Sequence, residues 1–110
     1  IGVVMTDEEA KLREEVLLGS SMQSVPAAVA LAKDYLIPAG KYEDAESVLF
    51  DVAGLQISAT GHLVQLTLGE LYIKMNELPR AERFLNIAAS SSEDEIRRKA
   101  TELLESLKDK

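Results

Sequence analysis

The sequence predicts an all-α protein of about six short helices that pack as antiparallel αα-hairpins. Apolar residues recur at helical spacing in one segment after another, and only a few residues connect each segment to the next. No segment alternates apolar and polar residues as a half-buried strand does. Because short connections favour antiparallel neighbours, we expect a series of helical hairpins.

Composition limits the function classes. A chain of 110 residues is large enough for one hydrophobic core, so we expect a single domain. Nineteen acidic residues against twelve basic ones give a net charge of −7, which argues against a nucleic-acid partner. No apolar run approaches the length that spans a bilayer, so we expect no membrane insertion. The chain begins at Ile1, which suggests an excised domain, a processed product or a chain from which a tag was removed; the compartment stays open, with the cytoplasm favoured.

Three helices are expected in the first half of the chain. Thr6 and Glu9 form a capping box before a helix over residues 7 to 18. Residues 19 to 24, "GSSMQS", are rich in Gly and Ser and predict a connector whose last residue, Ser24, caps the second helix. Pro26 suits the first turn of that helix, and Gly40 follows its end. A third helix is expected over residues 41 to 55.

Three more helices are expected in the second half. Residues 56 to 61 break the pattern, and residues 62 to 75 are apolar on almost every side, which predicts a helix buried on more than one side. After a turn at 76 to 78, Pro79 suits the start of a fifth helix that runs to about residue 89. Ser92 and Glu95 form a second capping box before the last helix.

A repeated pattern links the second helix to the fifth. Residues 65 to 85 contain Q-x₂-L-G-x₂-Y followed by A-x₃-L, and "LAKDY" with "GKYEDA" and Leu49 repeats the pattern upstream. Ala45 and Ala81, at corresponding positions, are 36 residues apart. This pattern resembles the tetratricopeptide repeat, W-x₂-L-G-x₂-Y…A-x₃-F…P, whose period is 34 residues. The resemblance covers about residues 25 to 93.

The repeat motif has a packing interpretation. Gly69 lets a neighbouring helix approach closely, and small Ala81 lies where the second helix of the hairpin crosses the first. The repeat-packing residues are Leu31, Tyr35, Gly40, Ala45, Leu68, Gly69, Tyr72 and Ala81. The chain departs from the family pattern, since Ala28 and Gln65 replace the Trp and one extra residue lies in "LIPAG" of the first copy.

The resemblance implies a short right-handed superhelix in four parts. These are an N-terminal helix and connector (1–24), a first repeat (25–57), a second repeat (58–93) and a C-terminal capping helix (94–110). In the family the first helix of each repeat lines a concave face that binds partners. Carried over, the partner-binding residues are Val29, Lys33, Leu36, Ile37, Leu66, Glu70, Ile73 and Lys74.

The partner-binding set is largely aliphatic. Exposed apolar grooves hold an amphipathic helix or an extended segment of a partner. The alternative is that these residues pack against the first or the last helix of so small a domain. Lys33 and Lys74 are the only cations of the set and Glu70 offsets them, so we do not expect the carboxylate clamp of some family members.

No residue pattern indicates an enzyme, a metal site or a cofactor. His62 is the single histidine and has no Cys or acidic partner at ligand spacing, so a structural role is expected. The run Ser90–Ser92 is explained by capping, and Glu8 or Glu93 by the helix dipole. Phosphate-loop, GxSxG, HExxH and calcium-loop motifs are absent from the sequence.

The sequence therefore predicts a protein–protein interaction module that holds a peptide or helix of a partner in an aliphatic groove. Two alternatives stay open. One is a small dedicated chaperone of the kind found in bacterial secretion systems. The other is a homo-oligomeric assembly domain that uses the same aliphatic faces or the faces of the first and last helices.

Overall fold

The computed structural model describes residues 7–18, 21–53 and 58–108. Within these ranges it has α-helices and one π-helical segment but no strand, which confirms the all-α class. The elements are α1 (Asp7–Leu18), α2 (Ser21–Leu31), the π-helical segment η1 (Ala32–Leu36), α3 (Tyr42–Ala53), α4 (Ser58–Lys74), α5 (Leu78–Ala88) and α6 (Asp94–Lys108).

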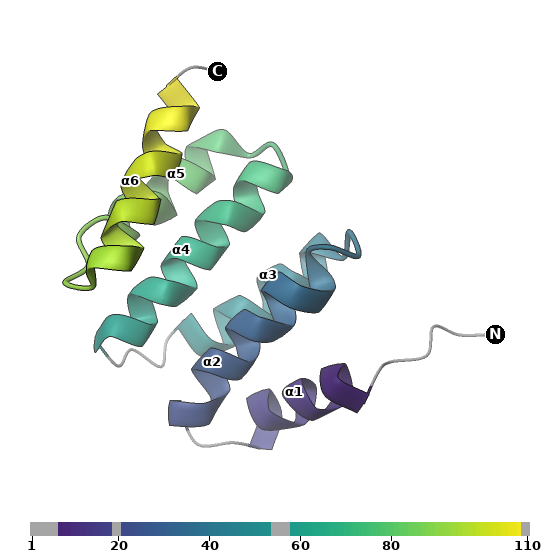
Figure 1. Ribbon diagram of the computed structural model, residues 1–110. Coiled ribbons are helices and arrows are strands. Elements are labelled where there is room, and N and C mark those ends of the chain that lie inside the picture. Colours follow the sequence, from purple (N-terminus) through teal and green to yellow (C-terminus); the bar gives the residue numbers. More distant parts are fainter. Residues whose placement is uncertain (1–6, 19–20, 54–57, 109–110) are drawn as a thin grey trace.

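The helices form two layers (Figure 1). The continuous helix α2–η1 lies beside α4, and α4 lies beside α6, while α3 and α5 lie behind them. Helix α1 packs chiefly against α2 at one end of the molecule. Helix α4 contacts α2, α3, α5 and α6, which explains why it is apolar on nearly all sides. We call α2–η1, α4 and α6 the front layer, and α3 with α5 the back layer.

The two hairpins turn in the same way. In the first, Lys41 N–H donates to the Leu36 carbonyl (2.9 Å) and Gly40 N–H to that of Ile37 (3.0 Å). In the second, Glu77 N–H donates to Tyr72 (2.8 Å) and Asn76 N–H to Ile73 (3.0 Å). Both are Schellman caps with the left-handed residue, Gly40 (φ 77°) or Asn76 (φ 58°), in the same place. The caps lie 36 residues apart, like Ala45 and Ala81.

The core follows the same spacing. Leu36 and Tyr72, Leu49 and Leu85, and Val52 and Ala88 are buried pairs separated by 36 residues. Leu31 and Leu68 are also fully buried. The repeat inferred from the sequence is therefore also a repeat of backbone turns and of core positions.

Gly69 marks a close approach between α4 in the front layer and α5 in the back layer. A Cβ placed on Gly69 would lie 2.5 Å from Cδ2 and 2.6 Å from Cγ of Leu85 on α5, which is closer than carbon atoms pack. The expectation that Gly69 lets the neighbouring helix approach is confirmed. Ala81, whose carbonyl oxygen lies 3.6 Å from the same point, is completely buried.

Tyr72 joins the two hairpins through its hydroxyl. The side chain is buried and stacks on Phe84 (centroids 5.5 Å apart), and its Oη donates to Glu46 Oε2 on α3 (2.6 Å). The Arg80 guanidinium lies 5.7 Å from the ring centroid and 3.8 Å from Glu46 Oε2. Burial, the hydrogen bond and the nearby negative charge of Glu46 together raise the pKa of Tyr72 to about 12.

The start of α2 differs from the expectation. The helix begins at Ser21, so residues 21 to 24 are helical instead of a connector. Ser24 does not cap α2: its hydroxyl lies 3.3 Å from the carbonyl oxygens of Glu15 and Val16, among the last four carbonyls of α1, which lack partners within their own helix. Pro26 lies inside the helix, past its first turn, where it removes one backbone hydrogen bond.

Two later boundaries differ as well. Helix α4 begins at Ser58, so residues 58 to 61, expected to break the pattern, are helical. Helix α6 begins at Asp94, which leaves Ser92 outside the N-cap position; the Ser91 hydroxyl accepts the Glu93 N–H instead (3.1 Å). Thr6 lies outside the described residues, as do residues 54–57, which include the last two residues of the expected third helix and the first two of the expected break.

The extra residue of the first repeat lies in the helix and not in the loop. Segment η1 is a π-helical turn, in which Ile37 N–H donates to the carbonyl of Ala32, five residues earlier (2.9 Å). Because the turn holds one more residue, Leu36 and not Tyr35 occupies the buried position of Tyr72. Tyr35 is half-buried, and its hydroxyl donates to Glu8 Oε2 on α1 (2.8 Å).

Candidate functional site

Two adjoining hollows lie on the front layer. The first, of about 330 Å³, lies between α2–η1, α4 and the start of α6, and the second, of about 480 Å³, lies between η1, α4 and the turn before α3. Lys33 lines both, so they form one surface that we call the α4 groove. The first is lined by Lys33, Leu63, Leu66, Glu93, Glu95, Ile96 and Lys99, and the second by Lys33, Ile37, Pro38, Tyr42, Glu70 and Lys74.

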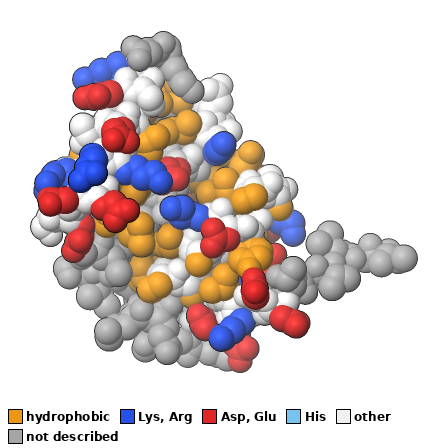
Figure 2. All heavy atoms as spheres, viewed as in Figure 1, with side chains coloured by type: hydrophobic (Ala, Val, Ile, Leu, Met, Phe, Trp, Pro, Cys, Tyr) orange, Lys and Arg blue, Asp and Glu red, His pale blue; other side chains and the backbone are white. Residues whose placement is uncertain are grey.

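One stripe of α4 forms the floor of the groove. Leu63, Leu66, Glu70 and Lys74 are spaced by three or four residues, which places them on one face of the helix. At a rise of 1.5 Å per residue the stripe is about 16 Å long. Figure 2 views this face and shows hydrophobic side chains gathered among charged ones. The groove can therefore contact several consecutive side chains of a bound segment.

Charge is distributed unevenly along the groove. Glu70 lies in its middle, and its buried Oε1 atom has no hydrogen-bond partner among the described residues but lies 3.9 Å from Lys99 Nζ on α6. Lys33 and Lys74 are exposed, and no carboxylate of the described residues lies within ion-pair distance of either. Glu93 and Glu95 line the opposite end beside Leu63.

Five of the eight residues predicted to bind a partner line this groove: Lys33, Ile37, Leu66, Glu70 and Lys74. Val29 and Leu36 line neither hollow; they are 6% and 1% exposed and belong to the core. Ile73 is half-buried and packs against the core without lining either hollow. Val29 and Leu36 are therefore core residues and are not available to a partner.

Sequence reasoning missed the contribution of α6. Ile96 and Lys99 form one side of the first hollow, together with Leu63 of α4. The order of the helices could have predicted this contribution. Antiparallel hairpins bring every second helix to the same side, so α6 lies on the same side as α2 and α4. Treating residues 94–110 only as a capping helix hid this wall of the groove.

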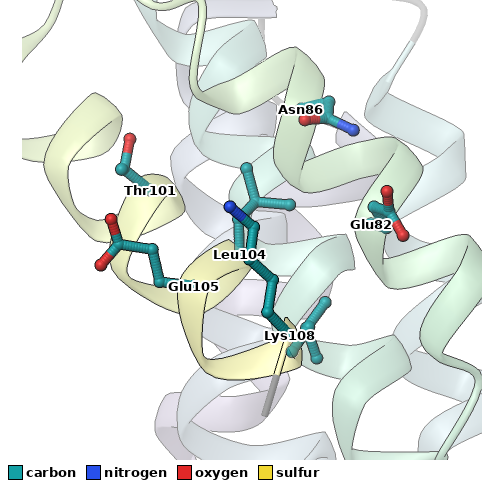
Figure 3. Close-up of a pocket in the computed structure, with 7 residues that line it drawn as sticks. Glu82, Asn86, Thr101, Leu104, Glu105 and Lys108 are labelled. Atoms are coloured by element: carbon teal, nitrogen blue, oxygen red, sulfur yellow. The ribbon is translucent and has the colours of Figure 1, made fainter. Parts of the chain in front are cut away.

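A smaller hollow of about 310 Å³ lies between α5 and α6 (Figure 3). Glu82 and Asn86 come from α5, and Thr101, Leu104 and Lys108 from α6. All of these except Leu104 are exposed polar side chains. This hollow offers less apolar surface than the α4 groove, so the groove is the stronger candidate for a binding site.

The described residues supply no metal site: no three His, Asp or Glu side chains among them gather closely enough to hold an ion. No helix in the described part of the chain has both the length and the apolar character needed to cross a bilayer. No protein-family model matches the sequence, and no curated protein or solved structure matches the chain.

Proposed function

We propose that the protein is a helical-repeat interaction module that binds a segment of another protein in the α4 groove. The observation that carries the proposal is the groove itself, a surface about 16 Å long with aliphatic side chains on its floor and wall. Grooves of this kind receive the apolar side chains of an amphipathic helix or an extended peptide. The tetratricopeptide-like motif supports the same function by resemblance, because the family binds partners on this layer.

Ile96 and Ile87 make a matched pair for the test. Ile96 lines the groove, whereas Ile87 lies on α5 in the back layer and is 42% exposed. A carboxylate placed at Ile96 puts a charge into the apolar hollow, and the same change at Ile87 leaves the groove intact. Leu66 is less suitable because, at 3% exposed, its replacement by Glu would destabilise the core.

The experiment selects peptides of about 11 residues, the helical length of the groove, from a random displayed library against the folded domain. The affinity of the enriched peptides is then measured for wild type, Ile96→Glu and Ile87→Glu, with circular dichroism to confirm helicity. We expect Ile96→Glu to weaken binding at least tenfold and Ile87→Glu to leave it unchanged. Equal binding to all three, or no enrichment at all, would contradict the proposal.

Self-association is a second candidate, favoured by a separate observation. Phe50 on α3 is 47% exposed and packs edge-on against Phe84 of α5 (centroids 6.0 Å apart), and Ile87 lies one helical turn further along α5. Exposed apolar groups on two adjacent helices can form an interface between two copies. Light scattering of wild type and Phe50→Glu tests it: a dimer that Phe50→Glu dissociates is expected, and a monomer at all concentrations would exclude it.

A further inference from the structure

We infer that the segment bound in the α4 groove has opposite charges at its two ends, basic beside the start of α6 and acidic beside η1, with aliphatic residues between. This inference rests on the proposed function and specifies the chemistry of the partner. It follows from the order of charged and apolar side chains along the stripe of α4.

The η1 end of the groove attracts an anion. Lys33 and Lys74 both line the second hollow, and among the described residues neither has a carboxylate within ion-pair distance. Glu70, the acidic residue of that hollow, has Lys99 as its nearest cation, 3.9 Å away. Two exposed ammonium groups thus remain available to a carboxylate, although the whole chain has 19 acidic and 12 basic residues.

The other end attracts a cation. Glu93 and Glu95 line the first hollow at the start of α6, and neither side chain is in an ion pair within the described part of the chain. Lys33 and Lys99 line this hollow as well, but Lys99 is paired with Glu70 (3.9 Å) and Lys33 is shared with the second hollow, so two unpaired carboxylates face one unpaired ammonium group here. The aliphatic side chains of Leu63, Leu66 and Ile96 lie in the same hollow. An apolar side chain held there would carry a neighbouring Lys or Arg to within reach of the two carboxylates.

Charge complementarity of this kind determines the orientation of the bound segment along the groove more than it raises the affinity. A segment inserted the wrong way round would place its acidic end beside Glu93 and Glu95 and its basic end beside Lys33 and Lys74, and like charges at both ends oppose that orientation. A carboxylate paired with an exposed lysine adds little free energy, so most of the affinity comes from the aliphatic side chains. The groove therefore selects segments by their pattern of charge as well as by their apolar residues.

The test repeats the peptide selection with a charge-reversed domain, Lys33→Glu/Lys74→Glu. Its control is Lys11→Glu/Lys108→Glu, which changes the net charge equally at exposed positions outside the groove. We expect wild type and control to enrich peptides with acidic residues at one end and basic residues at the other. The reversed domain should lose the acidic preference and bind the best wild-type peptide about tenfold more weakly.

A compensating exchange completes the experiment. Replacing the acidic residues of that peptide by lysines should weaken its binding to wild type and restore its binding to Lys33→Glu/Lys74→Glu. Peptides that depend on Ile96 but show no charge pattern would overturn this inference and leave the proposed function standing. Peptides that bind Ile96→Glu as tightly as wild type would overturn the proposed function itself.

Discussion

The two hairpins of this protein share their turns and differ in their first helices. From the Schellman cap onward, Gly40 to Val52 and Asn76 to Ala88 correspond at a constant spacing of 36 residues. Before the cap, the first hairpin has a π-helical turn and the second has regular α-helix. The difference shows that the cap and the helix after it are the regular part of the repeat. The extra residue of the first repeat lies in the helix before the cap.

The largest loss of stability is expected from a substitution at Gly69, where the two helices of the second hairpin approach closely. Gly69→Val forces a branched side chain against Leu85, and we expect a loss on the order of 3 kcal/mol in unfolding free energy, measured by urea denaturation. The first copy has Ala32 at this place in the motif, so it tolerates a Cβ there. Because Leu85→Ala removes the contacting atoms, the two substitutions should be coupled by at least about 1 kcal/mol. Strict additivity would show that the contact is unimportant.

The Tyr72 hydroxyl makes the stability of the second hairpin depend on pH. The corresponding buried residue of the first hairpin, Leu36, has no titratable group. Folding raises the pKa of Tyr72 from 10.0 to about 12. The protonated hydroxyl therefore contributes fully to the free energy of unfolding below pH 10, and this contribution is lost as the pH rises through 12. The contribution lost is about 2 to 3 kcal/mol. Denaturation at a series of alkaline pH values should show a steeper fall for wild type than for Tyr72→Phe. Parallel curves of stability against pH for wild type and Tyr72→Phe would contradict the raised pKa of Tyr72.

The two left-handed cap residues provide a smaller comparison. Apart from its chain neighbours, no described residue has an atom within 4 Å of a Cβ built on Gly40, so Gly40→Ala should cost only the conformational energy of the left-handed region, about 1 kcal/mol. Asn76→Gly should be neutral or stabilise by a few tenths of a kcal/mol, since glycine adopts this conformation freely. Thermal unfolding of both variants measures the difference, and an equal loss in both would contradict it.

Deleting Asp34 should have the smallest effect. Without the extra residue the first helix can continue as regular α-helix while Leu36 keeps its buried position. Because Asp34 is exposed, we expect the unfolding free energy to stay the same or rise by up to about 1 kcal/mol. Amide hydrogen exchange over residues 32 to 37 would show the change of helix type. A large loss of stability would mean that the π-helical turn is itself required.

Most of the fold could be predicted from the sequence, because it depends on local signals. Apolar periodicity located the helices, and Gly40 and Pro79 marked their limits within a few residues. The start of α2 was missed because Ser24 has the ordinary chemistry of an N-cap, and only the position of α1 shows that its hydroxyl serves carbonyls of another helix. The extra residue of the first repeat was placed in "LIPAG", and the π-helical turn was not foreseen, because a length change is usually tolerated best in a loop.

The site was predictable only in part. The motif brought Lys33, Ile37, Leu66, Glu70 and Lys74 to one surface, and the structure places all five along the groove. It could not separate Val29 and Leu36 from them, because an aliphatic residue at helical spacing has the same signal whether it faces the core or a groove. The wall formed by Ile96 and Lys99 depends on the packing of α6, which lies beyond the repeated motif.

The position of α1 at the end of the stack has a consequence for how the molecule opens. This helix packs chiefly against α2, with the Ser24 hydroxyl near its last carbonyls and Tyr35 bonded to Glu8. Opening such a terminal helix exposes little of the core, whereas opening α4 disrupts contacts with four other helices. A protease would therefore cut first near α1, at a low free energy of local unfolding, and would leave the α4 groove intact.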